Sequence, residues 1–316
     1  MASAGCSNFP YFYTVASSMG VTISAPLGCF VSFTNSPYYS HEHGSAIDIY
    51  FQGDSEAFSP VKGRVSQIFK VNSPPSKYFK ASSDEQLLIV QASDNPAFIV
   101  RILHVENATP TGTVLNVGDL IGTIPRSGFY DFWTDLHIHV EVRSPENVLR
   151  AKGSFGIVPE TKNSKLTINS EKASPYFQIV EADDNYCLLD SEVGVASLSP
   201  FVGITCEVGG SYGILDAGIP HYRVGSIHLS SGAEVRQGDK VTLWGVSIGE
   251  VLEFRNRLAV FRSYPLEVLL NNQPVRGLSL FPWIGTHPFI KAIPFTPTRP
   301  RWTIGEYVQL KLNSLV

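Results

Sequence analysis

Two histidines one residue apart lie in the short run 135–143, and their types and spacing suit metal binding or proton transfer. Side chains alternate across a strand, so His137, His139 and Glu141 share one face while apolar residues occupy the other. Two imidazoles on one rigid strand can direct ring nitrogens to a common point, as either chemistry requires. The alternative is an amphipathic strand whose polar face happens to carry histidines.

Two further residues upstream could take part in the same chemistry. Asp48 stands in the middle of the apolar run 46–51, where a carboxylate is costly unless something cationic pairs with it. His104 lies in the run 101–105, which predicts a buried strand. There a histidine either serves the site or is a satisfied group of the core. Five of the eight histidines fall between positions 41 and 139, so the candidate site belongs to this half of the chain.

The remaining histidines and the cysteines indicate no second site. We interpret His221, His228 and His287, which stand apart in the sequence, as structural or surface groups. The four cysteines form no C-x-x-C pair, which favours isolated buried thiols over a disulfide framework or a zinc knuckle. A pairing of Cys187 with Cys206 stays open. The other two cysteines are Cys6 and Cys29.

The composition predicts a mainly β protein. Only 16% of the 316 residues are charged, and 26 Gly and 21 Pro accompany 19 Phe and 13 Tyr. This mixture is typical of turn-rich sheets, and no long stretch has helical periodicity. A chain of this length has room for two domains. We expect a domain in residues 1–160, a polar connector, and a second β-rich, sandwich-like or barrel-like domain in residues 175–316.

Charge and hydropathy exclude several classes of partner. The formal net charge is −4 and no basic run stands out, so nucleic acid is not an expected partner. No apolar run approaches the length of a membrane span. The N-terminus shows no secretory signal, which predicts a soluble, cytoplasmic protein, or a secreted one only if a leader was removed.

Short motifs follow one another in a fixed order between residues 37 and 150. They are the segments 46–49, 59–65, 102–105, 117–122, 127–128 and 137–143. In composition and order this series resembles the lysostaphin/LytM-type zinc metallopeptidases, a family built on a duplicated hybrid β motif. The resemblance covers less than half of the chain and implies that the first domain is a β-sheet domain of that kind.

The resemblance also implies a set of roles. Asp48, His139 and one upstream histidine would hold Zn²⁺ and leave a fourth position open, as in catalytic zinc sites. His137 matches the general base of the family, and His104 matches the second histidine, which orients water or stabilises the oxyanion. For Glu141 we expect a supporting contact or a solvated strand end.

The upstream ligand is the one point at which the chain departs from the family. The usual spacing would place that histidine at position 44, which is occupied by Gly44. We favour His43 and keep His41 as the rival. An odd separation puts His43 and Asp48 on opposite faces of a regular strand, so a bulge or loop must intervene.

Two functions of different classes follow from these observations. The first is a zinc-dependent metallo-endopeptidase-like hydrolase that acts on peptides, with short Gly-rich or cross-linking peptides as the implied substrates. The second is a catalytically degenerate scaffold or binding module that uses the C-terminal β domain to recognise a partner. A carrier or phosphotransfer-like domain is a third reading, since related β topologies also use paired histidines.

Overall fold

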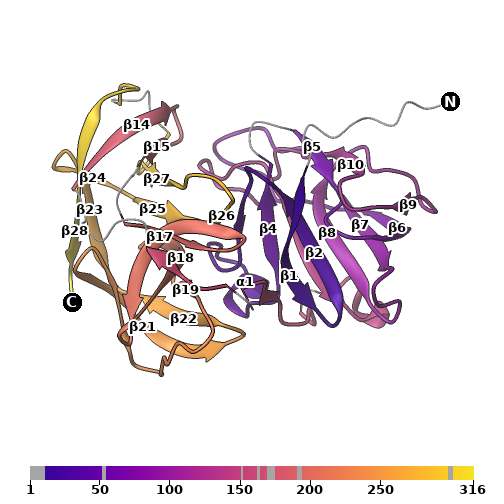
Figure 1. Cartoon of the computed structure of the whole chain (residues 1–316). Helices are drawn as coiled ribbons and strands as arrows, with labels where there is room; N and C mark the ends of the chain where they lie inside the picture. Colours follow the sequence, from indigo (N-terminus) through magenta and orange to yellow (C-terminus); the bar gives the residue numbers. More distant parts are fainter. Residues whose placement is uncertain are drawn as a thin grey trace. The chain divides into compact units, whose positions relative to one another are not determined.

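The computed structural model describes residues 11–51, 55–150, 152–161, 164–168, 175–190, 194–297 and 302–316. Nearly all regular structure in these residues is β (Figure 1). The prediction of a mainly β chain with one β-sheet domain followed by a second β-rich domain is confirmed. Contact density divides the chain into unit 1, residues 1–31 and 43–160, and unit 2, residues 32–42 and 161–316.

Unit 1 holds eleven of the named strands and a 3₁₀ turn over Pro145–Asn147. The strands are β1 (Phe12–Ser18), β2 (Val21–Pro26), β4 (Ile47–Tyr50), β5 (Glu56–Phe58), β6 (Gly63–Lys70), β7 (Gln86–Ala92), β8 (Ile99–Val105), β9 (Val114–Leu115), β10 (Leu120–Thr123), β11 (Ile138–Arg143) and β12 (Val158–Pro159). The short strand β3 (Phe30–Ser32) lies where the chain passes into the first segment of unit 2.

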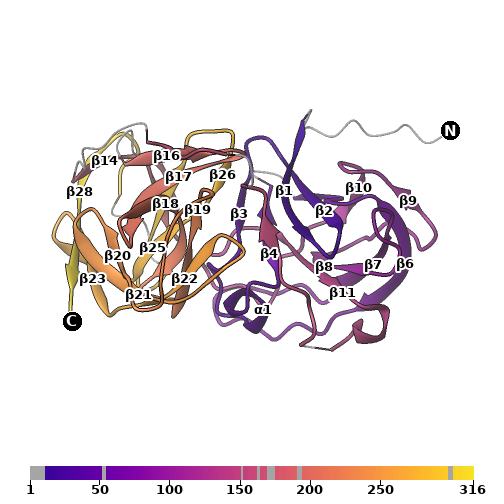
Figure 2. The ribbon, with the colours of Figure 1, turned by 60° about the horizontal axis from the view of Figure 1, so that its bottom comes forward.

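One antiparallel sheet of unit 1 runs in the order β4, β11, β8, β7, β6, β9 (Figure 2). β11 is paired on both sides, and all six of its residues are buried, including those of the polar face. The apolar face carries Ile138, Val140 and Val142, which are entirely buried. β11 is thus a central strand of this sheet, and the polar side chains predicted from its alternation lie inside unit 1.

Unit 2 contains the short helix α1 (Tyr39–Glu42) and the remaining strands. They are β13 (Thr167–Ile168), β14 (Tyr176–Ala182), β15 (Cys187–Asp190), β16 (Val195–Leu198), β17 (Phe201–Val208), β18 (Ser211–Ile219), β19 (Val224–Leu229), β20 (Lys240–Leu243), β21 (Val246–Arg255), β22 (Leu258–Ser263), β23 (Leu266–Leu270), β24 (Gln273–Val275), β25 (Gly277–Leu280), β26 (Trp283–Ile284), β27 (Phe289–Ile293) and β28 (Tyr307–Ser314).

Six strands of unit 2 pair in a closed cycle, in the order β17, β18, β19, β22, β21, β20 and back to β17. Their inward residues join one large apolar core that includes Leu215, Ile227, Val241 and Phe261. Asp216 of β18 is entirely buried and accepts hydrogen bonds from the backbone N–H groups of Phe33 (2.6 Å) and Thr34 (3.2 Å). A buried carboxylate thus attaches the segment 32–42 to the rest of unit 2.

Candidate metal and acid–base site

The centre of the site is a pair of side chains on neighbouring strands. Asp48 of β4 and His139 of β11 are direct partners in the antiparallel register, so their side chains lie on the same face. Nδ1 of His139 lies 2.8 Å from Oδ1 of Asp48, and both residues are buried. Two residues that were expected to share one site are thus in contact.

Glu141 holds the other side of the His139 ring. Its Oε1 lies 3.1 Å from Nε2 of His139, and its Oε2 accepts a hydrogen bond of 2.6 Å from Nε of Arg143. Arg143 is completely buried and also donates to the backbone carbonyl oxygens of Asn147 and Arg150. Glu141 therefore makes the supporting contact that metal-ligating histidines commonly have at the outer ring nitrogen.

The carboxylates of Asp48 and Glu141 both contact the imidazole of His139, so the site favours positive charge on that ring. Burial alone would lower the pKa of His139, but the hydrogen bonds to Asp48 and Glu141 raise it to about 9. Burial would likewise raise the pKa of Glu141, while His139, Arg143 and Arg101 lower it to about 2. The cation that Asp48 needs is thus supplied in this structure by a protonated imidazole, and a metal ion could take its place.

The two candidates for the upstream ligand differ in burial. His43 is exposed, whereas His41, in the segment counted with unit 2, is completely buried. Between His43 and β4, Gly44 adopts a left-handed backbone with φ of 57°. Two imidazoles and a carboxylate are a donor set that suits zinc.

His137 precedes β11 and lies against the same carboxylate, with its Nε2 3.5 Å from Oδ2 of Asp48. Its Nδ1 lies 2.9 Å from the backbone carbonyl oxygen of Asp135, so Nδ1 donates and Nε2 is the basic nitrogen. The ring stacks on Tyr130 and packs against Tyr50. Burial lowers the pKa of His137 to about 3, and nearby His104 contributes to this shift. His137 is therefore a neutral imidazole that can accept a proton.

His104 reaches the site through an irregularity at the end of β8. Leu103 pairs with His139, so regular alternation would turn His104 to the opposite face of the sheet. His104 instead has a left-handed backbone, with φ of 64°, and its ring centroid lies 5.1 Å from that of His137 and 6.3 Å from that of His139. The sequence indicated a histidine at this place, and the broken alternation explains how it joins the others.

Several residues of the site were not singled out from the sequence. Arg143 and Tyr130 are buried around the histidines, and the hydroxyl group of Tyr130 donates a hydrogen bond of 2.8 Å to the carbonyl oxygen of His137. Glu85 and Ser127 form a buried hydrogen bond beside His104. Ser127 belongs to one of the short motifs, but no sequence signal marks Glu85, because it stands between a polar loop and β7.

Other histidines and cysteines behave differently. His228 is completely buried between Phe33 and Phe201, and His287 is a half-exposed side chain paired with Asp190. The described cysteines are buried, and Cys187 and Cys206 carry free thiols. Cys6 lies outside the described residues. Burial raises the pKa of the Cys187 and Cys206 thiols, which makes them unreactive.

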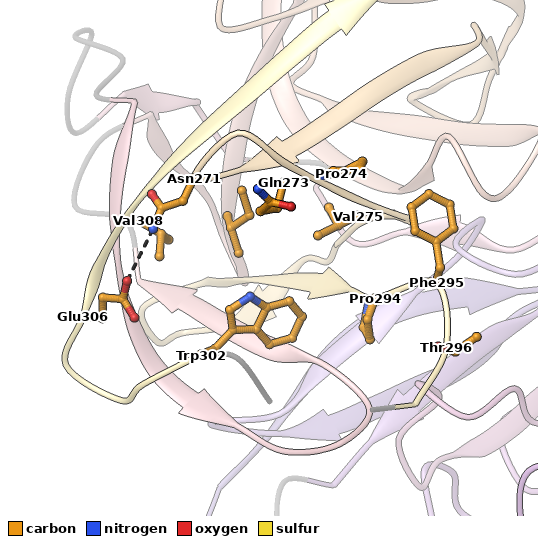
Figure 3. A pocket seen from close by; sticks show the side chains of 11 residues that line it. Asn271, Gln273, Pro274, Val275, Pro294, Phe295, Thr296, Trp302, Glu306 and Val308 are labelled. Atoms are coloured by element: carbon orange, nitrogen blue, oxygen red, sulfur yellow. Dashed lines mark hydrogen bonds between the residues drawn. The ribbon is translucent and has the colours of Figure 1, made fainter. Parts of the chain in front are cut away.

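Unit 2 has a hollow of its own, with a volume of about 400 Å³ (Figure 3). The Trp302 indole lies in its floor, and Asn271 and Glu306 form a hydrogen bond of 3.3 Å at one end. The aromatic and proline side chains and the polar groups around it are of the kinds that line small-molecule and peptide sites. They include Pro274, Pro294, Phe295 and Gln273.

None of the described helices has the length and apolar character needed to cross a bilayer. Two family models match the chain. Residues 27–159 match the model described as domain of unknown function (DUF8155) N-terminal domain, and residues 172–312 match the corresponding C-terminal domain. Neither a curated protein nor a solved structure matches the chain significantly.

Proposed function

This chain belongs to the DUF8155 family, and we propose that its N-terminal domain is a zinc-dependent hydrolase that cleaves peptide bonds. The observation that carries this proposal is the contact of Asp48 with His139 across two paired strands, beside the neutral imidazole of His137. Carboxylate, imidazole and an uncharged base on one rigid sheet form the constellation that metal-assisted hydrolysis needs.

The residues present fit a zinc ion. Asp48 and His139 offer a carboxylate and an imidazole in contact at 2.8 Å, and an upstream histidine, His43 or His41, would complete the donor set. Glu141 binds the outer nitrogen of His139, so Nδ1 of that ring is directed at Asp48 and at the shared point. When bound, the ion would act as a Lewis acid toward the scissile carbonyl group and toward water.

The remaining residues act on the proton and the substrate. His137 takes the proton from the attacking water at Nε2, because its Nδ1 donates to the Asp135 carbonyl group. The rings of Tyr50 and Tyr130 hold His137 in place. His104, whose ring centroid lies 5.1 Å from that of His137, supplies a second imidazole to orient water or to stabilise the developing oxyanion.

Metal analysis tests the site itself. Purified protein, and protein reloaded with zinc, should contain one zinc ion per chain, and Asp48→Ala and His139→Ala should each lose it. His287→Ala, which removes a half-exposed histidine of unit 2, serves as the control and should keep the metal. A zinc content unchanged by both site substitutions would remove the metal centre from the proposal.

Hydrolysis of a panel of short Gly-containing peptides tests the activity. His137→Ala should retain zinc and lower the turnover number by a factor of about 10² to 10⁴, as expected for the loss of a general base. A wild-type protein with zinc fully bound and no turnover on any peptide would contradict the hydrolase. Peptide as the substrate and the cytoplasm as the location remain predictions.

The second candidate is a binding module, which the hollow in unit 2 favours. Its partly buried indole, exposed Phe295 and polar groups Asn271 and Glu306 would suit an extended peptide. Titration of labelled protein with the same peptides should then shift amide resonances of residues 270–275 and 294–296, and Trp302→Ala should abolish the shifts. Saturable shifts there without any hydrolysis would favour the module over the enzyme.

A further inference from the structure

Glu85 is a completely buried carboxylate to which the proposed mechanism gives no role. It stands immediately before β7, and each of its oxygens has one partner. Oε1 lies 2.6 Å from Nδ1 of His104, and Oε2 accepts a hydrogen bond of 2.7 Å from the hydroxyl group of Ser127. A buried carboxylate is costly unless its hydrogen bonds are satisfied, so these two contacts need an explanation.

The contact with His104 decides which ring nitrogen carries a proton. An ionised carboxylate can only accept hydrogen bonds, so Nδ1 of His104 must be the donor. Nδ1 then stays protonated whether the ring is neutral or charged, and Nε2 is the nitrogen whose proton can come and go. Among the described residues, Nε2 has no hydrogen-bond partner, and it is therefore available to water or substrate.

The surroundings of His104 allow the ring little freedom. It packs edge-on against Tyr130, with the ring centroids 4.9 Å apart, and against His137 at 5.1 Å. Because the backbone of His104 is left-handed, its ring does not point in the direction that regular strand alternation would give it. A side chain that departs from the sheet pattern needs another group to fix its direction, and Glu85 is the group bonded to it.

We propose that Glu85 is a positioning residue, which keeps the proton on Nδ1 of His104 and leaves Nε2 for the reaction. This inference rests on the proposed hydrolase for its catalytic meaning, but its structural content is independent of zinc and substrate. It is analogous to the carboxylate that orients the histidine of a catalytic triad and fixes its tautomer. Ser127 donates to the other oxygen of Glu85 and, among the described residues, makes no hydrogen bond to His104.

Long-range proton–nitrogen correlation spectra of the labelled full chain test the tautomer, with His104→Gln used to assign the ring signals. Nδ1 of His104 should be protonated in the wild-type protein and in Glu85→Gln, whose amide oxygen can still accept. In Glu85→Ala a substantial fraction should change to the tautomer protonated on Nε2. A wild-type ring unprotonated at Nδ1 would overturn the inference, and so would a folded Glu85→Ala protein with an unchanged tautomer.

Ser127→Ala is the matched control for a merely structural role. It removes the other hydrogen bond of the same buried carboxylate and should leave the His104 tautomer as in the wild type, even if it costs comparable stability. Should Glu85→Ala not fold, the wild-type spectrum together with Glu85→Gln still decides where the proton lies. Equal changes of tautomer in Ser127→Ala and Glu85→Ala would contradict a specific role for Glu85.

Peptide hydrolysis supplies the catalytic readout. Glu85→Ala should lower kcat by about 10- to 100-fold with a smaller change in KM, and Glu85→Gln should recover most of the loss. A protein that hydrolyses no peptide refutes the proposed function while the tautomer measurement still stands. An active enzyme whose kcat is unaffected by Glu85→Ala refutes the positioning role while the hydrolase stands.

Discussion

The charge on Glu141 determines what His139 can bind. Glu141 lies between His139 and Arg143, with Arg101 at 3.7 Å, so the negative charge is compensated on one side and offered to the imidazole on the other. A carboxylate bonded to the outer nitrogen of a ligating histidine fixes the ring and increases the basicity of the inner nitrogen. The strength of the metal site should therefore depend on a residue that would not touch the metal.

We predict that Glu141→Gln lowers the affinity for zinc by about 10- to 100-fold. The amide keeps the shape and one acceptor oxygen but removes the charge that favours a cation on His139. Competition with a chromophoric chelator measures the dissociation constant. Glu146→Gln, the same change at an exposed position outside the site, is the control, and equal affinities in the two variants would contradict the role of Glu141.

At this scale the sequence led to part of the site only. The order of the short motifs placed Asp48 and His139 in one expected site, and their atoms are in contact. The choice between His41 and His43 depended on the path of the chain around Gly44, which spacing alone does not define. Glu85 could not be found because its partners, His104 and Ser127, lie 19 and 42 positions away and meet it only in the folded unit.

Three neighbouring strands supply the central residues of the candidate site. β4, β11 and β8 are adjacent in the sheet and supply Asp48, His139 and His104. The loop after β10 supplies Ser127 and Tyr130, so its position relative to the strands must also be exact. Gly128 lies in this loop, and a Cβ atom there would stand 1.7 Å from the carbonyl oxygen of Pro74. The loop can approach the segment around Pro74 only because residue 128 is a glycine.

Gly128→Ala should therefore destabilise the protein by roughly 3 kcal/mol, because backbone must move to make room for the methyl group. Gly28→Ala is the control. Its Cβ would meet nothing within 4 Å, so only the backbone strain at φ of 88° remains, which should cost about 1 kcal/mol. Urea unfolding of both variants measures the difference, and equal losses would show that the contact with Pro74 is relaxed without cost.

The strands themselves were accessible from the sequence, since apolar alternation and turn residues mark most of the longer ones. The prediction of a mainly β chain is confirmed for that reason. Very short strands such as β12 and β13 carry too few residues to show a period. The left-handed residue at the end of β8 could not be predicted either, because positive φ is uncommon at residues other than glycine, even at histidine, where it is enriched.

For the whole molecule, the two-domain layout follows from length and from the polar connector, and the two family models agree with it. Contact density counts residues 32–42 with unit 2, although they precede most of unit 1 in the sequence. The segment contains a polar loop that fits either unit, so this assignment could not be predicted from the sequence. The buried carboxylate of Asp216, which binds the backbone at Phe33 and Thr34, is its physical basis.

The stability of unit 2 should depend on pH through His221. Burial, together with the positive charges of Arg276 and Lys291, lowers the pKa of His221 to about 3, below the usual 6.5. Only the neutral ring suits the folded state. The contribution of the neutral His221 ring to the free energy of unfolding is complete above about pH 6.5 and is lost progressively as the pH falls toward 3.

Between about pH 7.5 and pH 4.5, we expect His221 to lower the free energy of unfolding by about 3 kcal/mol. Glutamine at position 221 can still contact Ser279 but cannot titrate. The free energy of unfolding of the wild type, relative to that of His221→Gln, should therefore fall by this amount between the higher and the lower pH. Urea unfolding followed at both pH values provides the comparison. A difference independent of pH would mean that the ring is protonated in the folded protein at little cost.

The backbone pairing of β4 with β11 limits which changes of sequence can alter the separation of Asp48 and His139. Asp48 and His139 are 91 positions apart, yet backbone hydrogen bonds between their strands fix their separation. Insertions or deletions in exposed turns of the chain between β4 and β11 leave the separation of the two side chains unchanged. Relatives can thus vary these turns while the same two side chains stay in register.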